Sequence, residues 1–284
     1  MNSITKHCRA KINLAIDVLS KRADGYHDVR MVMTQVGVCD TVRVDLRSDG
    51  RIVLSGENMP LDESNLAYRA ADAFFKASGM DCGCDIYIEK HIPMGAGMAG
   101  GSTDAAGVIN ALDELLDTNM SLAERMKIGG RLGADIPFCI MGGCVLAEGI
   151  GDKLMPLTPL PEMYYLIAKP EQSVSTKWVY EHLDFSKKPK NLDIDAMVTA
   201  INSGDRKGIY RSMGNVLENS TKNICPDVEI YKADMLEFGA QAALMSGSGS
   251  AVFGIFEDKE KLLAAQKMFE GVHPDAKVWA VAGG

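Results

Sequence analysis

A strict alternation of apolar and polar residues predicts the first strand of the chain. Between residues 8 and 19 the apolar side chains occupy every second position, at Ala10, Ile12, Leu14, Ile16 and Val18. A period of two is typical of a β-strand that rests one face on a core. Lys11 and Asn13 belong to the other face, so we expect their side chains to point away from the core.

The same periodicities predict the other elements of the first half. Alternation predicts strands at residues 29–38, 41–47, 51–54, 84–90 and 144–147. Helical spacing predicts helices at residues 64–78, after residue 99 and at about 121–131. We expect Ser64 to be the N-cap of the first helix and Gly79 to end it.

A proline-rich stretch at residues 155–162 is typical of a junction between domains. We therefore expect one domain at residues 1–155 and a second at residues 156–284. In the second, patterning predicts strands at 164–168, 241–245, 251–256 and 277–281, and helices near 175–183, 191–202, 226–238 and 258–270. Strands and helices in both halves predict a two-domain α+β fold.

Composition narrows the class of protein. The 284 residues are 46% hydrophobic and 24% charged, as in folded proteins with two cores. A net charge of −8 disfavours proteins that coat nucleic acid or anionic membranes. No secretory signal or membrane-length apolar run is present. The seven irregularly spaced cysteines are typical of reduced thiols, so we expect a cytoplasmic protein whose partner is a small molecule.

A glycine-rich segment carries the strongest chemical signal. Residues 93–106 read Pro-Met-Gly-Ala-Gly-Met-Ala-Gly-Gly-Ser-Thr-Asp-Ala-Ala, between a predicted strand and a predicted helix. Glycines let the backbone approach a ligand, and the helix start offers amides and a positive dipole end. The hydroxyls of Ser102 and Thr103 could reach a phosphate oxygen or Mg²⁺. The segment predicts a polyphosphate site; a flexible turn before a helix is the alternative.

Two common phosphate-binding motifs do not fit this segment. No Gly-Lys-Ser or Gly-Lys-Thr ends it, so it is not a P-loop. Gly95, Gly97 and Gly100 have the spacing of a dinucleotide-binding fingerprint, but the segment does not follow the first strand of a βαβ unit.

Three segments together resemble the GHMP kinases, the family of galactokinase and of homoserine, mevalonate and phosphomevalonate kinases. Residues 93–106 resemble the family's central motif. Ala-Lys-Ile-Asn-Leu at residues 10–14 resembles its N-terminal motif, and Leu-Met-Ser-Gly-Ser-Gly-Ser-Ala-Val-Phe at residues 244–253 its C-terminal glycine loop. The resemblance runs in order along the whole chain, which is more specific than one loop.

Three further segments resemble one branch of this family, whose members phosphorylate a cytidine-diphosphate-linked methylerythritol in the non-mevalonate route to isoprenoids. They are Lys-Arg-Ala-Asp-Gly-Tyr-His at residues 21–27, Gly-Ala-Asp-Ile-Pro-Phe at 133–138 and Ser-Asn-Leu at 64–66. Two positions depart from the pattern: Ala99 stands where many members have glycine, and Asp104 where some have asparagine. Both lie in the glycine-rich segment and could tune nucleotide affinity.

The resemblance implies a two-domain kinase with its active site in the cleft between the domains, using ATP and Mg²⁺. It implies that Asp135 is the base that activates the acceptor's 2-hydroxyl and that Lys11 is its partner. Taken alone, an aspartate in a loop is more often an N-cap or turn residue. The ATP-binding positions implied are Asn65, Pro93, Met94, Gly95, Ala96, Gly97, Met98, Ala99, Gly100, Gly101, Ser102 and Thr103.

The resemblance also implies where the acceptor binds. Tyr26 and His27 would meet its cytidine end, because an aromatic ring can stack on cytosine and an imidazole can hydrogen-bond to its polar edge. Thr176 and Tyr180, four residues apart on a predicted helix, and Asn13 fall where substrate contacts occur. A half-buried core tyrosine is the alternative for Tyr180.

Two other functions stay open at this point. Another GHMP kinase, such as one for homoserine or mevalonate, would share most of the motifs but not Asp-Gly-Tyr-His at residues 24–27. A binding protein without activity on the same scaffold would not need Lys11 and Asp135. Monomer and homodimer both remain compatible with the sequence.

Overall fold

The computed structural model describes residues 2–187, 189 and 192–283, and the chain forms two compact units. Unit 1 comprises Met1–Ala10, Val38–Ile92 and Ala99–Gly142, and unit 2 comprises Lys11–Gly37, Pro93–Met98 and Gly143–Gly284. The units alternate along the chain because strands β1 (Ser3–Lys21) and β2 (His27–Arg47) each contribute to both. The single boundary expected at residues 155–156 does not coincide with the division into these two units. A division into domains at that boundary stays a prediction.

The strands of unit 1 follow the alternation in the sequence. Strand β4 (Gly83–Glu89) pairs antiparallel with the last residues of β2 and parallel with β3 (Ile52–Gly56). Ile86 and Ile88 are fully buried and Tyr87 is exposed, as predicted. One face of this sheet therefore forms the core of the unit.

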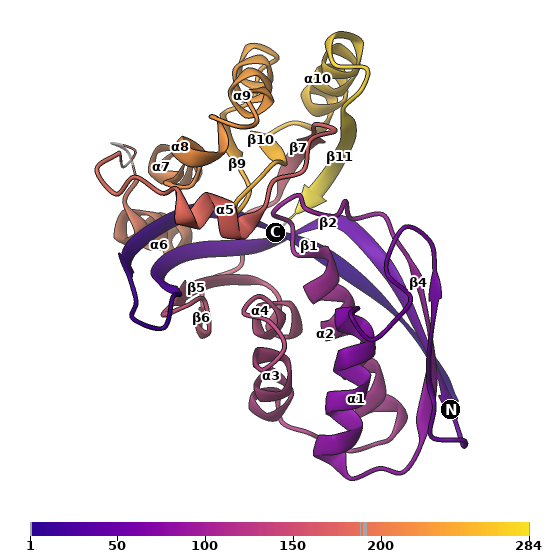
Figure 1. Ribbon diagram of the computed structural model, residues 1–284. Coiled ribbons are helices and arrows are strands. Elements are labelled where there is room, and N and C mark those ends of the chain that lie inside the picture. Colours follow the sequence, from indigo (N-terminus) through magenta and orange to yellow (C-terminus); the bar gives the residue numbers. More distant parts are fainter. Residues whose placement is uncertain (1, 188, 190–191, 284) are drawn as a thin grey trace. The chain divides into compact units, whose positions relative to one another are not determined.

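Four helices cover that face of unit 1 (Figure 1). They are α1 (Leu66–Ser78), α2 (Gly100–Leu115), α3 (Leu122–Gly130) and α4 (Ile136–Met141). Helix α2 packs against the other three, and its residues from Thr103 to Ile109 are all buried. This burial anchors the start of α2, where the glycine-rich segment joins it.

Unit 2 contains an antiparallel sheet in the order β9 (Ala242–Met245), β10 (Val252–Phe256), β7 (Met163–Lys169) and β11 (Lys277–Gly283). Helices α9 (Asp227–Glu237) and α10 (Lys259–Val272) pack on it. Tyr165 and Phe253 are buried in its core with ring centroids 6.2 Å apart. The loop between β9 and β10 is the predicted C-terminal glycine loop.

The rest of unit 2 surrounds the middle of β1 and β2. Strand β5 (Cys144–Glu148) pairs with β2, β6 (Lys153–Pro156) pairs with β5, and the short β8 (Gly214–Asn215) runs parallel to β1. The remaining helices are α5 (Thr176–Glu181), α6 (Ile194–Ser203), α7 (Arg206–Ser212) and α8 (Glu218–Thr221).

Three expectations from the sequence were wrong. Asn65, not Ser64, is the N-cap of α1, because its side chain accepts a hydrogen bond from the amide of Ala67. Residues 29–38 and 41–47 form one continuous strand, β2. Lys11 and Asn13 do not point away from the core: their exposed fractions are 5% and 0%. Gly79 does end α1, in the left-handed conformation.

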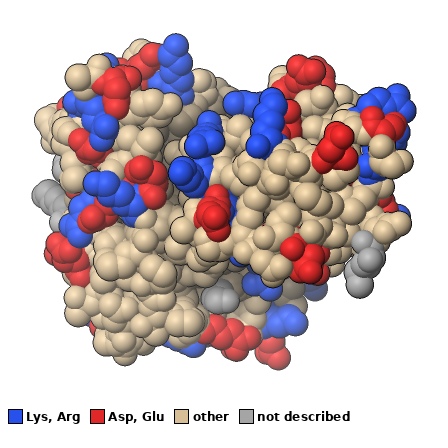
Figure 2. Space-filling model, turned by 90° about the horizontal axis from the view of Figure 1, so that it is seen from below, with Lys and Arg blue, Asp and Glu red and all other residues tan. Residues whose placement is uncertain are grey.

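Charged side chains of both signs are interspersed on the face drawn in Figure 2. Within the described part of the chain, no helix has the length and apolar character needed to cross a membrane.

Candidate active site

The glycine-rich segment turns sharply before α2. Gly95 and Gly97 adopt positive φ angles of 63° and 72°, which glycine adopts without strain. A Cβ on Gly97 would stand 2.0 Å from the carbonyl oxygen of Ser246, so only glycine fits there. Ala99, the N-cap of α2, also adopts a left-handed φ of 58°, which is unfavourable for a residue with a Cβ. A glycine would adopt this backbone conformation at position 99 without strain.

The first amides of α2 are available to a ligand. Ala99 supplies no side-chain cap, and the helical hydrogen bonds begin with the amide of Thr103 donating to the carbonyl of Ala99. The amides of Gly100, Gly101 and Ser102 therefore precede the first acceptor within the helix. A Cβ on Gly101 would contact only Leu66, at 3.6 Å. The protein has room for a side chain there, so the glycine leaves the amide open to an anion.

Several other residues predicted to bind ATP have side chains that are buried or hydrogen-bonded within the protein itself. The hydroxyl of Thr103 is buried and donates to the carbonyl of Arg9 at 2.8 Å, which leaves Ser102 as the accessible hydroxyl. Asn65 caps α1 and also donates to the carbonyl of Pro60 at 2.8 Å. The side chains of Ala96 and Met98 are buried, so these two residues could offer a ligand only their backbone.

A buried ion cluster in unit 1 anchors both ends of the glycine-rich segment. The ammonium of Lys90 bonds to Asp40 and, at 2.7 Å, to Asp104 in the first turns of α2. Asp40 also accepts hydrogen bonds from the amides of His91 (2.5 Å) and Ile92 (2.7 Å), where the segment begins. The cluster thus fixes both the residues that lead into the segment and the helix that follows it.

The cluster holds one ammonium and two carboxylates with little solvent. Asp40 is fully buried and Asp104 is 3% exposed; Oδ1 of Asp104 has no hydrogen-bond partner among the described residues. Burial, partly opposed by the attraction of Lys90 and supported by the charge of Asp40, raises the pKa of Asp104 to about 7. Burial and the charges of Asp104 and Asp40 also raise the pKa of Cys8 to about 12. The sequence indicated Asp104 only as a departure from the family pattern.

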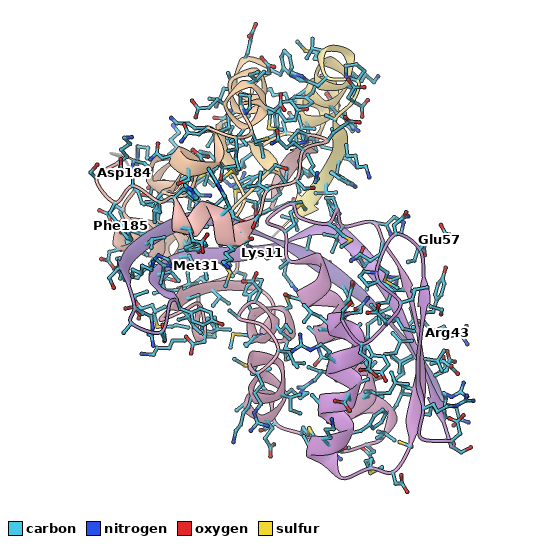
Figure 3. The ribbon with its side chains drawn as sticks, viewed as in Figure 1. Lys11, Met31, Arg43, Glu57, Asp184 and Phe185 are labelled. Carbon is cyan, nitrogen blue, oxygen red and sulfur yellow. The ribbon has the colours of Figure 1, made fainter. Side chains whose placement is uncertain are left out.

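Lys11 lies in unit 2, where the C-terminal glycine loop approaches β1. Its Nζ donates to Oδ1 of Asn13 at 2.5 Å, and Nδ2 of Asn13 lies 3.4 Å from the sulfur of Met31. A Cβ on Gly247 would stand 3.2 Å from Nζ of Lys11. Figure 3 shows Lys11 and Met31 beside each other. The ammonium has no carboxylate partner among the described residues, which leaves it available to an anionic group.

The two glycine loops of unit 2 are hydrogen-bonded to one another. The hydroxyl of Ser246 donates to the carbonyl of Gly97 at 2.9 Å, and the amide of Ala251 donates to the carbonyl of Ala96 at 3.2 Å. The amide of Lys11 donates to the carbonyl of Met98 at 3.2 Å. Hydrogen bonds therefore connect residues 96–98 both to the backbone of Lys11 and to the C-terminal glycine loop.

Asp135 occupies a turn of unit 1 directly before α4. It is the N-cap position of that helix, but its side chain makes no capping hydrogen bond, and it is partly exposed. The common structural role of a loop aspartate is therefore not the one it has here. Gly133 and Pro137 on either side fix the turn, and the amide of Ile136 donates to the carbonyl of Gly133 at 3.3 Å.

An aromatic group in unit 2 gathers most of the predicted cytidine contacts. The ring of His27 lies 5.1 Å from that of Tyr180, and Tyr26 is 60% exposed. Burial, followed by the charge of Lys21, lowers the pKa of His27, so its imidazole is neutral at pH 7.

Sequence reasoning missed one member of this aromatic group. Phe185 stacks on His27 with ring centroids 6.2 Å apart and is 41% exposed (Figure 3). A single large aromatic residue in the polar stretch after α5 was the available signal. Thr176, which was predicted to bind substrate, is exposed and its hydroxyl lies 2.8 Å from that of Ser248 in the C-terminal loop.

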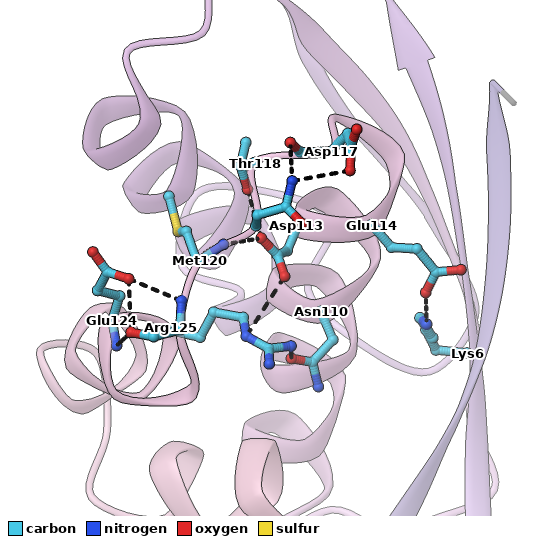
Figure 4. Close-up of polar contacts among 11 residues, drawn as sticks. Lys6, Asn110, Asp113, Glu114, Asp117, Thr118, Met120, Glu124 and Arg125 are labelled. Atoms are coloured by element: carbon cyan, nitrogen blue, oxygen red, sulfur yellow. Dashed lines mark hydrogen bonds and ion pairs between the residues drawn. The ribbon is translucent and has the colours of Figure 1, made fainter.

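A polar cavity of about 470 Å³ in unit 1 is a weaker candidate (Figure 4). Both of its cationic groups are engaged: Lys6 pairs with Glu114, and Arg125 pairs with Asp113 and donates to Asn110. It adjoins the second half of α2, about 15 Å along the helix from its start. The cavity therefore has no unpaired charge to offer a phosphate and lies apart from the glycine-rich segment.

Comparison with known families agrees with the motifs. Residues 65–143 match the GHMP kinases N terminal domain, and residues 197–272 match the GHMP kinases C terminal domain. The proteins named 4-diphosphocytidyl-2-C-methyl-D-erythritol kinase from Caldicellulosiruptor bescii and Lachnoclostridium phytofermentans are 47% and 44% identical to this chain. The first match covers 90% of both chains, and the second covers 95% of this chain and 92% of the relative.

Solved structures give the same result for the fold. A crystal structure of 4-(cytidine 5'-diphospho)-2C-methyl-D-erythritol kinase matches with a TM-score of 0.83 and 31% identity, over 99% of both chains. Homoserine kinase from Cytophaga hutchinsonii matches with a TM-score of 0.78 at 18% identity, over all of this chain and 95% of the other, which shows the shared fold alone. The predicted two-domain α+β kinase fold is thereby confirmed, and the chain belongs to the GHMP kinases, in the family of 4-diphosphocytidyl-2-C-methyl-D-erythritol kinases.

Proposed function

We propose that this kinase transfers the γ-phosphoryl group of ATP to the 2-hydroxyl of 4-diphosphocytidyl-2-C-methyl-D-erythritol, in the non-mevalonate route to isoprenoid precursors. The observation that carries the proposal is the 41–47% identity, over 90% or more of this chain, to proteins named for that acceptor. The glycine-rich segment, Lys11, Asp135 and the aromatic group at His27 supply the residue types that this reaction needs.

The ATP phosphates are assigned to the start of α2 and the turn before it. Support comes from the amides of Gly100, Gly101 and Ser102, which precede the first acceptor in the helix, and from the positive end of its dipole. Pro93, Met94 and Gly95 are at least partly exposed and belong to the same proposed cradle.

Mg²⁺ is proposed to arrive with the nucleotide. Among the described residues, no group of three or more His, Cys, Asp or Glu side chains is arranged to hold a metal. Mg²⁺ commonly keeps water and substrate phosphates as ligands and takes only one or two protein groups, so a sparse donor set fits it. We assign that contact to the hydroxyl of Ser102. When bound, the ion would neutralise charge on the phosphates.

Asp135 is proposed to accept the proton of the acceptor's 2-hydroxyl as its oxygen attacks the γ-phosphorus and ADP leaves. A tertiary hydroxyl is crowded and weakly nucleophilic, so a positioned base matters more than usual and contributes about 10²–10⁴-fold. The absence of a capping bond leaves this carboxylate available. Lys11 is proposed to stabilise negative charge on the attacking oxygen and the transferring group, and Asn13 holds its ammonium in place.

The cytidine end of the acceptor is assigned to the aromatic group. The exposed ring of Tyr26 is proposed to stack on cytosine, and the neutral imidazole of His27 to hydrogen-bond to the base's polar edge. Tyr180 and Phe185 flank His27 and would hold its ring in position. Thr176 joins them as a proposed polar contact.

The proposed partner is a small molecule, and not nucleic acid, because the chain carries a net charge of −8. We also propose a cytoplasmic location, supported by seven irregularly spaced cysteines, a pattern typical of reduced thiols. The proposed domains are residues 1–155 and 156–284, which contain the N-terminal and C-terminal family matches respectively.

A panel of acceptors tests the proposed function. ADP release by the purified protein is measured with 4-diphosphocytidyl-2-C-methyl-D-erythritol, homoserine and mevalonate, each with ATP and Mg²⁺. We expect turnover with the first acceptor alone. Turnover of homoserine or mevalonate at a higher kcat/KM would assign the chain to another GHMP kinase activity, and ATP binding with no turnover would identify a binding protein.

A further inference from the structure

The short segment from β8 to α8, residues 214–221, belongs to no motif identified in the sequence, yet its polar side chains are buried. Asn215, Glu218 and Thr221 stand three residues apart, with exposed fractions of 0%, 9% and 0% for the whole residues. Strand β8 is held to β1 by parallel pairing with Ala15 and Ile16. The segment is therefore fixed to the strand that carries Lys11.

All three side chains bind the backbone at the C-terminal glycine loop, Ser246–Ser250, or at Met245, the last residue of β9 directly before it. Nδ2 of Asn215 donates to the carbonyls of Met245 (2.9 Å) and Gly247 (2.8 Å). Oε1 of Glu218 accepts from the amide of Met245 at 2.8 Å, and the hydroxyl of Thr221 lies 3.1 Å from the carbonyl of Ser248. We call Asn215, Glu218 and Thr221 the loop clamp.

The clamp residues are themselves held in place. Oδ1 of Asn215 accepts from the amide of Leu217 at 2.9 Å, which orients its amide so that both N–H groups face the loop. Oε2 of Glu218 pairs with Lys232 at 2.6 Å. A buried side chain whose polar groups are all hydrogen-bonded has few alternative rotamers. The clamp side chains therefore hold the loop to which they are bonded in one position.

The loop that the clamp holds is in contact with the proposed phosphoryl-transfer groups of unit 2. A Cβ on Gly247 would stand 3.2 Å from Nζ of Lys11 and 3.0 Å from the carbonyl oxygen of Gly97. Ser246 donates to that same carbonyl. A shift of Gly247 by even 1 Å would therefore alter the space around the ammonium of Lys11.

We propose that Asn215, Glu218 and Thr221 are positioning residues for phosphoryl transfer: they fix the C-terminal glycine loop, which in turn sets the place of the Lys11 ammonium against residues 96–98. This inference rests on the proposed function for the role of Lys11. It differs from a purely structural role because every contact of the clamp with the β9–β10 hairpin lies at the hairpin's loop end, between Met245 and Ser248, beside the ammonium.

Thr221 offers the cleanest variants, because valine has nearly the same shape and lacks only the hydroxyl. Thr221→Val should lower kcat by about 10-fold to 100-fold, the range for a small misplacement at a reacting centre, while the KM for ATP changes less than about twofold. Thr221→Ser, which keeps the hydroxyl, should restore most of the wild-type kcat. Asn215→Asp, which places carboxylate oxygens against two carbonyls, should lower kcat further.

Thr199→Val is the matched control. The hydroxyl of Thr199 donates to the carbonyl of Asp195 at 2.9 Å within helix α6, on the surface. This variant removes an equivalent hydroxyl without touching the loop and should keep the wild-type kcat. Melting temperatures of all variants, measured under assay conditions, correct each kcat for the folded fraction.

Amide hydrogen exchange supplies a readout that does not depend on the acceptor. Residues 246–250 should exchange about tenfold faster in Thr221→Val than in wild type or Thr199→Val. A wild-type kcat in Thr221→Val, unchanged exchange of the loop, or failure of serine to restore kcat would each overturn the proposal. Failure of the proposed function is distinguishable from failure of this inference, because wild type itself would then show no turnover.

Discussion

Replacing Asp104 by asparagine should change how the stability of the protein depends on pH. Asp104 shares the ammonium of Lys90 with Asp40, and one of its oxygens is buried without a hydrogen-bond partner among the described residues. Burial, partly opposed by Lys90, raises its pKa from 3.8 to about 7. Asparagine keeps an oxygen that can accept from Lys90 but cannot ionise.

The direction and size of this pH effect on stability follow from proton linkage. Between pH 4 and 7 the folded protein binds a proton at Asp104 that the unfolded chain has released, so stability falls as pH rises through this window. A shift of about 3 units corresponds to about 4 kcal/mol over the whole range, of which roughly 2–3 kcal/mol is lost between pH 5 and 8. The loss is complete only above about pH 8, because about half of Asp104 in the folded protein is still protonated at pH 7.

Urea unfolding of wild type and Asp104→Asn at pH 5, 6, 7 and 8 measures this effect. The variant should gain stability relative to wild type by roughly 2–3 kcal/mol as pH rises from 5 to 8. The control is Asp72→Asn on α1, which removes an exposed carboxylate paired with Lys76 and should change stability by less than about 1 kcal/mol at every pH. A difference between Asp104→Asn and wild type that is the same at pH 5 and pH 8 would refute the reasoning.

Four further changes probe the other parts of the site. Lys11→Met should lower kcat by about 10²–10⁴-fold with ATP affinity preserved, since its ammonium acts on developing charge; weaker ATP binding with normal kcat would make it a phosphate ligand instead. Gly101→Val should weaken ATP binding at least tenfold in calorimetry, whereas the control Gly271→Val, in open space on α10, should not. Tyr26→Ala should lower kcat/KM for the cytidylyl acceptor by roughly 10-fold to 100-fold and leave ATP binding intact; an unchanged kcat/KM would remove it from the cytidine site. Ala99→Gly should raise the melting temperature by about 2–4 °C, because glycine relieves the left-handed backbone; a fall would show that Ala99 is unstrained.

Elements with strong periodicity could be predicted from the sequence, and their ends followed local chemistry. The helix at residues 121–131 was expected close to α3, where Ser121 and Glu124 form a reciprocal capping box. The cap of α1 was misplaced by one residue because Ser64 and Asn65 are both good caps. The local turn decides between them: Ser64 is bonded to Asp62, and the side-chain oxygen of Asn65 accepts from the amide of Ala67.

The burial of Lys11 could not be predicted from alternation. A strand with polar residues on one face normally turns that face to water, but here other parts of unit 2 cover the side chains of Lys11 and Asn13. β8 pairs along β1, and the C-terminal glycine loop lies against Lys11. Asn13 and Met31 then replace water around the ammonium and the amide. The polar face of β1 is therefore buried at Lys11 and Asn13, where alternation predicts an exposed surface.

The Lys90 cluster and the loop clamp gave the weakest signals in the sequence. The Lys90 cluster joins residues from three separate segments of the chain, and the loop clamp joins residues about 30 positions apart. Their side chains are ordinary polar residues whose spacing carries no periodic signal. Motifs predict the residues that would touch ligands, whereas the residues that we propose to position them were found only from long-range contacts in the structure.

The identity of the phosphorylated hydroxyl tests the central claim most directly. Wild-type protein is incubated with ATP, Mg²⁺ and 4-diphosphocytidyl-2-C-methyl-D-erythritol, and the product is followed by proton-coupled ³¹P NMR. We expect one new phosphomonoester resonance that is a singlet, since the carbon bearing the 2-hydroxyl has no hydrogen to split it. The signal should be nearly absent with Asp135→Asn, whose ATP binding should be normal. A resonance split by a neighbouring C–H, or no new monoester from wild type, would contradict the account.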